Sequence, residues 1–174
     1  MVFTIALPAR ALSVSEQRVP PRSIFALAIA TVFGIGYVPV APGTFGSAAG
    51  LLLWMVLPGS TVVQASAIVA LFVLGSLAGN VAERHFGRTD PRQVIVDEVM
   101  GMLITLFLNP VSLKGAFVGF LFFRATDVIK PYPANRLERL PGGVGVMADD
   151  AMAAVYANLA LRAAILILDN RVIG

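Results

Sequence analysis

Apolar residues occur along this chain in long uninterrupted blocks, and no segment alternates polar and apolar positions as a strand does. The clearest block covers residues 61–82 and contains no charged residue. A helix of about 20 such residues crosses the roughly 30 Å hydrocarbon layer of a membrane. The small residues Gly75, Ser76, Ala78 and Gly79 within it favour close packing against a second helix. This block therefore predicts a membrane-spanning helix.

The remaining apolar stretches are shorter or interrupted. They cover residues 23–37, 45–57, 99–108, 114–123 and 151–168. Apolar helices of about 10 to 14 residues are too short to cross a membrane alone and are typical of core or re-entrant segments. The pattern predicts an all-α fold, a compact bundle of about five to six helices. Several of these are expected to be membrane-embedded, and some broken or re-entrant.

Composition supports a membrane protein. Of the 174 residues, 57% are hydrophobic and 13% charged, and the mean hydropathy is +0.84, whereas soluble domains carry about 25% charged residues. A net charge of only +3 gives no indication of nucleic-acid binding. Cysteine is absent, which excludes disulfides, thiolate zinc sites and a cysteine nucleophile. The single histidine, His85, is interpreted as a solvated residue of a basic loop.

The chain is expected to form one helical membrane domain, residues 23–174, preceded by a flexible lead, residues 1–22, that lacks the apolar core of a signal peptide. Arginines in this lead and in the loop at residues 83–92 predict that both lie on the cytoplasmic side. The alternative is that several of the helices form only the buried core of a soluble protein.

Five of the ten acidic residues fall in three tight clusters, each near the end of an apolar helix. They are Asp97, Glu98, Asp127, Asp149 and Asp150. If the helices bundle with these ends together, the five carboxylates meet in one pocket. Unpaired carboxylates in a low-dielectric pocket are costly, so they require cations, protons or water. Oxygen ligands of this kind suit Mg²⁺ or Mn²⁺ better than zinc.

Each acidic cluster also has a purely structural explanation. Asp97 and Glu98 would favour the positive end of a helix dipole, and the pair at 149 and 150 would cap the last helix. Asp127 would neutralise Arg124 at the i,i+3 spacing. The three clusters together, in a chain so poor in charge, favour a functional site.

Two glycine-rich stretches lie beside these clusters. In "GIGYVPVAPGTFGS" (residues 34–47), prolines break the helix, Gly43 permits close backbone approach, and Thr44 and Ser47 offer hydroxyls. The start of the following helix would seat an anion, although a simple turn is the alternative. "PGGVGVM" (residues 141–147) predicts a flexible loop, which either closes over a substrate or merely connects two helices.

Four stretches, in this order, resemble the phosphatidylglycerophosphatase A family of bacteria. They are "GIGYVPVAPGTFGS", "VDEVMG", "FRATDVIKPYP" and "PGGVGVMADDAMAA", and the resemblance covers residues 30–160. It implies Mg²⁺-dependent removal of the terminal phosphate from phosphatidylglycerophosphate, which gives phosphatidylglycerol in phospholipid biosynthesis. It also implies a multi-pass protein of the bacterial inner membrane whose active site faces the cytoplasm. The oligomeric state stays open.

The implied reaction assigns roles to the clustered residues. The five acids are the expected ligands of one or two Mg²⁺ ions, and Glu98, Asp149 and Asp150 are also the catalytic candidates. Glu98 would serve as ligand or general base for attack by a metal-activated water. Alternatively, Asp149 or Asp150 would form an aspartyl-phosphate. The expected phosphate-binding residues are Gly43, Thr44, Ser47, Arg124 and Lys130, the arginine acting through its planar fork and the lysine as a point charge.

Two other classes of function compete with this one. Carboxylates within a membrane and a broken helix also occur in ion pathways, so a small ion transporter or channel subunit is the main alternative. A helical binding module that has lost its chemistry is the other. The position of the acids at helix ends, beside cations suited to phosphate, argues against ion transport, and the intact acidic clusters argue against a binding module.

Overall fold

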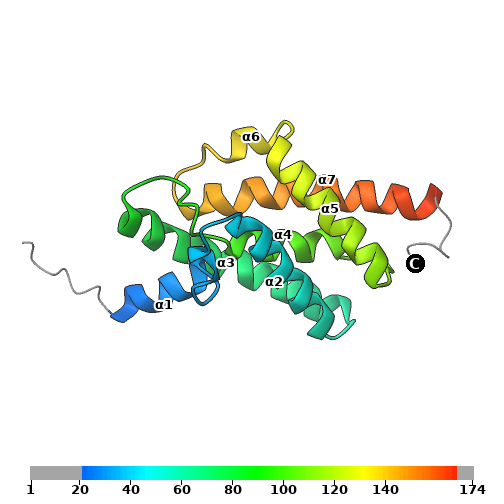
Figure 1. Cartoon of the computed structure of the whole chain (residues 1–174), viewed down its shortest axis with the longest axis horizontal. Coiled ribbons are helices and arrows are strands. Elements are labelled where there is room, and N and C mark those ends of the chain that lie inside the picture. The colour runs from blue at the N-terminus through cyan, green and yellow to red at the C-terminus, as the bar shows by residue number, and fades with distance from the viewer. Residues whose placement is uncertain (1–20, 168–174) are drawn as a thin grey trace, which may run out of the picture.

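The protein is described here by a computed structural model that covers residues 21–167, so the expected lead lies almost wholly outside the described residues. Every regular element in this range is a helix, which confirms the all-α prediction. Figure 1 shows them in chain order: α1 (Pro21–Ala30), the short 3-10 helix η1 (Ile35–Tyr37), α2 (Pro42–Val56), α3 (Thr61–Phe86), α4 (Val96–Leu106), α5 (Leu113–Ile129), α6 (Ala134–Leu137) and α7 (Gly143–Ile167). The described helices exceed the expected five or six because α6 forms a separate single turn.

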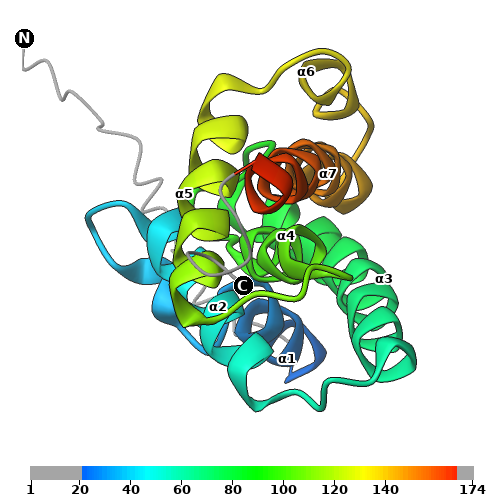
Figure 2. The ribbon, with the colours of Figure 1, turned by 90° about the vertical axis from the view of Figure 1, so that its right-hand side faces the viewer.

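Helix α4 lies at the centre of the bundle. Viewed end-on in Figure 2, it is surrounded by α2, α3, α5 and α7, and it contacts all four. Nine of its 11 residues are buried. One apolar cluster, which includes Met100 and Met147, packs α4 against α1, α3 and α7. A second cluster, which includes Phe123 and Leu161, packs it against α2, α5 and α7. The element that carries Asp97 and Glu98 is therefore fixed on every side.

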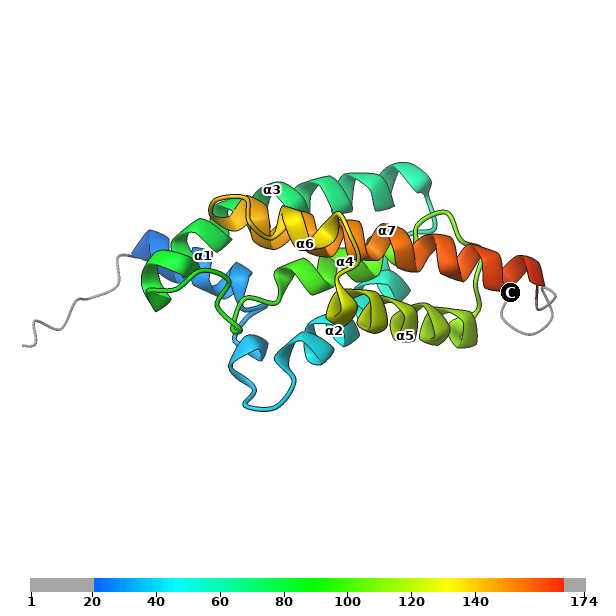
Figure 3. The same cartoon turned by 90° about the horizontal axis from the view of Figure 1, so that it is seen from above.

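Helices α3 and α7 are long and apolar enough to cross a membrane. They lie side by side in Figure 3 and contact each other through small residues. A Cβ atom added to Gly79 would lie 2.8 Å from the Cα atom of Gly143, and Gly75 and Ala78 are also buried. The predicted packing role of the small residues in α3 is thus confirmed. Helix α3 runs to Phe86, four residues beyond the apolar block, before Gly87 ends it with a φ of 67°.

The first helix is shorter than the apolar pattern predicts. Helix α1 ends at Ala30, because Val32, Phe33 and Gly34 have φ angles of 48°, 54° and 92°. A left-handed backbone cannot continue a right-handed helix. The chain turns instead into η1 and then starts α2 at Pro42, which has no N–H group for a helix to satisfy.

The last helix begins eight residues earlier than expected, at Gly143 and not at residue 151. The prediction of a flexible loop over residues 141–147 is wrong for its last five residues, which are helical. The Asn80 side chain of α3 accepts a hydrogen bond from the Gly143 N–H at 3.1 Å and so caps the start of α7. A partner 63 positions away in sequence leaves no local signal. Asp149 and Asp150 consequently lie in the second turn of α7 and do not cap it.

Candidate active site

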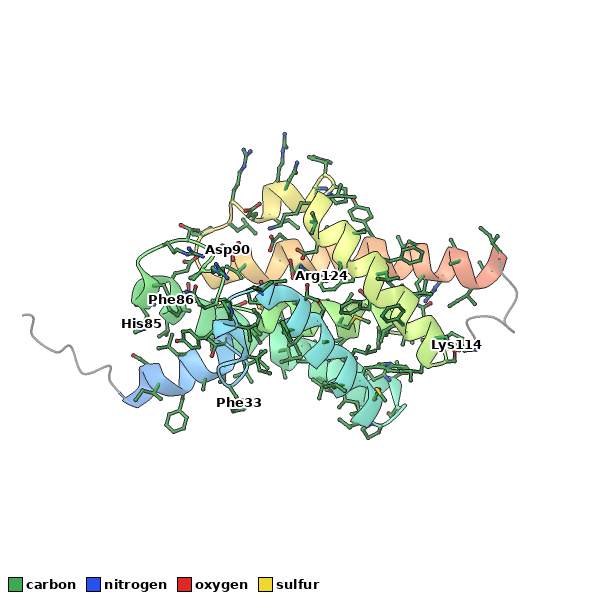
Figure 4. All side chains as sticks on the ribbon, viewed as in Figure 1. Phe33, His85, Phe86, Asp90, Lys114 and Arg124 are labelled. Carbon is green, nitrogen blue, oxygen red and sulfur yellow. The ribbon has the colours of Figure 1, made fainter. Side chains whose placement is uncertain are left out.

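A cavity of about 230 Å³ lies where α2, α4 and α7 begin and α5 ends. Six carboxylates line it: Asp90, Asp97, Glu98, Asp127, Asp149 and Asp150. Its cationic lining residues are Arg92, Arg124 and Lys130. Figure 4 shows Arg124 near the end of α5 on the side of Asp90, with Lys114 at the far end of the same helix. All five predicted carboxylates therefore converge on one cavity, although they come from three helices.

The tightest group within the cavity is formed by Asp97, Glu98 and Asp150. One carboxylate oxygen from each lies within 4.8 Å of the other two. Asp97 and Asp150 are only 6% and 4% exposed. Each of the three side chains also has a buried oxygen without a hydrogen-bond partner, as does Asp149. Buried acceptors are normally satisfied, so this group fits a divalent cation bound by oxygen ligands.

The local electrostatics also favour a cation. Burial, and then the negative charge of Asp150, raise the pKa of Glu98 to about 8. Burial and the neighbouring Glu98 raise the pKa of Asp97 well above its usual value. Burying these negative charges costs free energy. The first turn of α4 offsets part of this cost, because both acids lie at the positive end of the helix dipole. The residual cost is removed either by protons or by a bound cation.

Arg124 is held over the cavity by partners on two helices. Its Nη1 atom lies 2.7 Å from Asp127 Oδ2 and donates to the Ser47 hydroxyl at 3.4 Å. Ser47 is fully buried and donates in turn to the Gly43 carbonyl at 3.0 Å. Ser47 thus supports the guanidinium through this hydrogen bond and does not line the cavity. Thr44 is exposed and does not line it either.

Lys130 reaches the cavity from the cap of α5, where its own φ of 43° ends the helix. Its Nζ atom lies 2.5 Å from Asp149 Oδ2 and 3.6 Å from Glu138 Oε2. Burial by itself would lower the pKa of Lys130, but the ion pair with Asp149 outweighs it and raises the pKa. The ammonium group is therefore a permanent positive charge at neutral pH, suited to an anion.

Gly43 is the point at which α2 comes closest to the charged groups. A Cβ atom added there would lie 2.2 Å from Glu98 Oε1 and 3.2 Å from both terminal nitrogens of Arg124. Any side chain at this position would displace the carboxylate or the guanidinium. The predicted close backbone approach is present, and the groups it admits are Glu98 and Arg124.

Asp90 and Arg92 line the same cavity and were not among the predicted site residues. They lie in the loop between α3 and α4, which the sequence identified only as basic. Burial raises the pKa of Asp90, although Lys130 opposes the shift. The one available signal was that this loop lies close to Asp97 in the sequence. The position of the loop at the cavity depends on the tertiary structure.

Comparison with known proteins places this chain in a family. Residues 28–165 match the family model described as phosphatidylglycerophosphatase A. The chain belongs to the phosphatidylglycerophosphatase A family. It is 35% identical to the phosphatidylglycerophosphatase A of Haemophilus influenzae, over 74% of this chain and 82% of that protein. With the phosphatidylglycerophosphatase A of Escherichia coli it shares 33% identity, over 73% and 76% of the two chains.

A third relative of this chain has a different name. A Bacteroides thetaiotaomicron protein, provisionally named a phosphatidylinositol-3-phosphatase, is 36% identical over 77% of this chain and 89% of its own length. No solved structure matches the chain. Membership of the family identifies the protein as a phosphatase and does not favour the ion-transport alternative.

Proposed function

We propose that the protein hydrolyses the terminal phosphate of phosphatidylglycerophosphate in a Mg²⁺-dependent reaction that yields phosphatidylglycerol for phospholipid biosynthesis. The observation that carries this proposal is the convergence of partnerless, buried carboxylate oxygens with Arg124 and Lys130 in one cavity. A phosphomonoester needs a cation bound by oxygen ligands and fixed positive charges around its own oxygens. The names of the Haemophilus and Escherichia relatives support the choice of lipid.

Asp97, Glu98 and Asp150 would hold the ion, with Asp127 and Asp149 at the edge of the same group. Mg²⁺ is the expected ion because all the available donors are hard oxygens. When bound, it would neutralise the carboxylates and withdraw charge from the phosphate oxygens.

The chain's own residues would perform the remaining work. The Arg124 guanidinium would bind two phosphate oxygens through its planar fork, while Lys130 would contribute a point charge. Glu98, whose carboxylate belongs to the same group, would serve as general base and accept the proton of the water that attacks phosphorus. The bond between phosphorus and the headgroup oxygen then breaks, and that oxygen takes a proton from solvent.

Direct attack by water is favoured over an aspartyl-phosphate on one observation. Asp149, a candidate nucleophile, forms an ion pair with Lys130 at 2.5 Å. This ion pair occupies the carboxylate oxygen Oδ2, which reduces its availability for attack on phosphorus. Asp150 belongs to the group that would hold the ion.

A lipid substrate requires a protein at the membrane. Helices α3 and α7 support this, because each is long and apolar enough to cross a membrane. We place the protein in the bacterial inner membrane as a multi-pass protein. The cavity would face the cytoplasm, because the loop between α3 and α4 and the segment around α6 are rich in arginine.

The proposal is tested by phosphate release from phosphatidylglycerophosphate by the full chain in detergent, with Mg²⁺ or with a chelator. Asp150→Asn keeps the shape of the side chain but removes a charge from the group that would hold the ion. We expect at least a 100-fold loss of kcat/KM, because the variant removes an interaction with the reacting centre. Glu83→Gln is the matched control: Glu83 lies outside the cavity, and glutamine can still accept the hydrogen bond from the Asp90 N–H.

Two outcomes would contradict the proposal. One is phosphate release by the natural chain that is unaffected by the chelator, which would remove the ion from the reaction. The other is an Asp150→Asn variant that inserts into membranes and releases phosphate as fast as the Glu83→Gln control.

A further inference from the structure

Arg92 differs from the other two cations of the cavity in its charge balance. Arg124 is paired with Asp127, and Lys130 with Asp149 and Glu138. Within residues 21–167 Arg92 forms no ion pair; its Nη2 atom donates to the Pro39 carbonyl at 2.6 Å. A carbonyl fixes the guanidinium without neutralising it. The remaining N–H groups and the full positive charge are therefore available to an anion.

Arg92 also lies between two cavities. On one side it lines the carboxylate cavity with Arg124, and on the other a separate cavity of about 210 Å³ between the η1 segment and the start of α4. Gln93 lines this second cavity, and its amide oxygen is buried without a hydrogen-bond partner. A buried polar atom with no partner in the protein indicates a polar ligand. The second cavity therefore offers a charged donor and a free acceptor side by side.

The wall of the second cavity continues into an exposed apolar segment. Tyr37 lines the cavity and is 54% exposed, and Phe33 and Val40 beside it are 88% and 72% exposed. Phe33 lies at the edge of the molecule in Figure 4, away from Arg124. Three large apolar side chains exposed within eight positions form a surface suited to lipid. Arg92 thus lies between the two cavities, and Tyr37 of the second cavity belongs to the exposed apolar segment.

We infer that Arg92 binds the phosphodiester of a phospholipid substrate while the terminal phosphomonoester lies in the carboxylate cavity. This inference rests on the proposed function and specifies the substrate class of the same site. A lipid with both groups carries its diester between its terminal monoester and its acyl chains, as Arg92 lies between the carboxylate cavity and the second cavity with its exposed Tyr37. Arg92 would then select lipids that carry a diester over those in which the monoester is attached directly to diacylglycerol.

The test compares two substrates in mixed detergent micelles with Mg²⁺: phosphatidylglycerophosphate, which has the diester, and phosphatidic acid, which lacks it. Arg92→Gln removes the charge but keeps a donor for Pro39. We expect a loss of roughly 10-fold to 100-fold in kcat/KM with phosphatidylglycerophosphate, mainly through KM, because a charged hydrogen bond to the substrate is lost. With phosphatidic acid the change should be under about 2-fold. Arg88→Gln, in the same loop but outside both cavities, is the control.

A second measurement does not depend on catalysis. Phosphatidylglycerol keeps the diester and lacks the terminal phosphate, so its stabilisation of the purified protein in thermal unfolding reports the diester site alone. Arg92→Gln should weaken this stabilisation, and Arg88→Gln should not. Equal losses with both substrates, or undiminished phosphatidylglycerol binding by Arg92→Gln, would overturn the inference. If the natural chain releases phosphate from neither lipid, the proposed function fails, and the binding measurement still decides the role of Arg92.

Discussion

At the scale of single residues, the site depends on very close contacts between charged groups and backbone. Gly43 admits Glu98 and Arg124 to positions that a methyl group would occupy. Ser47, expected to bind phosphate, instead supports Arg124 by accepting its hydrogen bond. A hydroxyl in a sequence motif thus has two possible uses, and burial decides between them. The full burial of Ser47 favours support, and its role in phosphate binding stays a prediction.

Gly43→Ala should reduce kcat/KM for phosphate release by roughly 10-fold to 100-fold. The new Cβ atom would lie 2.2 Å from Glu98 Oε1, so the carboxylate must move, and small displacements of catalytic groups cost about this much. Steady-state kinetics in detergent micelles provide the measurement. Gly59→Ala is the matched control, since nothing lies within 4 Å of its added Cβ atom. Equal activity in the two variants would show that Gly43 is not needed for the position of Glu98.

The protonation of Glu98 predicts how stability depends on pH once metal is removed. Its pKa rises from the usual 4.5 to about 8 on folding, so between these values the folded chain holds a proton that the unfolded chain releases. The free energy of unfolding should therefore fall as pH rises through this window. Asp97 shifts in the same direction. Ion binding requires deprotonated carboxylates, so stabilisation by Mg²⁺ should increase over the same range.

Thermal unfolding in detergent at several pH values, with EDTA or with Mg²⁺, measures both effects. Glu98→Gln cannot titrate, so its EDTA profile should be flatter than that of the natural chain. An EDTA profile in which stability rises with pH would contradict the assignment of a buried, protonated Glu98.

At the scale of elements, helix ends are satisfied by side chains from other helices. Asn80 of α3 caps the start of α7. The Asn158 amide of α7 donates to the last carbonyls of α4, those of Ile104, Thr105 and Phe107, at 2.9, 3.0 and 2.8 Å. An uncapped helix end in an apolar environment is costly. These two asparagines therefore fix where α4 and α7 lie, and with them the acids that the two helices carry.

Asn158→Leu, of similar volume, should lower the free energy of unfolding by roughly 1–3 kcal/mol, because it removes three hydrogen bonds from the carbonyls at the end of α4. Thermal or denaturant unfolding in detergent measures the change. Asn135→Leu is the control, since Asn135 is exposed in α6. A stability unchanged from that control would mean that the α4 carbonyls are satisfied without Asn158.

At the scale of the whole molecule, the cavity and most of the positive charge of residues 23–167 share one end of the bundle. The cations of that end are Arg84, Arg88, Arg92, Arg124, Lys130, Arg136 and Arg139, whereas Lys114 and Arg162 lie at the other. Helix α5 joins the two ends over 17 residues, about 26 Å at 1.5 Å per residue. This asymmetry favours a cytoplasmic cavity by the positive-inside rule.

The orientation is testable because the chain contains no cysteine. Single substitutions Asn135→Cys, in α6, and Lys114→Cys, at the start of α5, mark the two ends at exposed positions. A membrane-impermeant maleimide should label Asn135→Cys only in inverted vesicles and Lys114→Cys only from the outside of intact cells. Each variant serves as the control for the other. Labelling of Asn135→Cys from outside would reverse the proposed orientation.

The sequence by itself determined the fold class and the family, and it singled out the five carboxylates that line one cavity. Its apolar blocks lack the alternation of a strand, so helices were the expected way to satisfy the backbone of these blocks in an apolar environment. Charges are so sparse that three acidic clusters stood out, and the ordered motifs identified the family. The assignment of the five acids and the two expected cations to specific catalytic roles stays a prediction.

Only the tertiary structure decided where α7 begins, which hydroxyls reach the cavity, and that Asp90 and Arg92 line it. Each of these depends on a contact between segments far apart in the chain: Asn80 with Gly143, Ser47 with Arg124, Arg92 with Pro39. Local patterns report what a segment does with its neighbours in sequence. They carry no information about a partner that approaches only when the bundle packs.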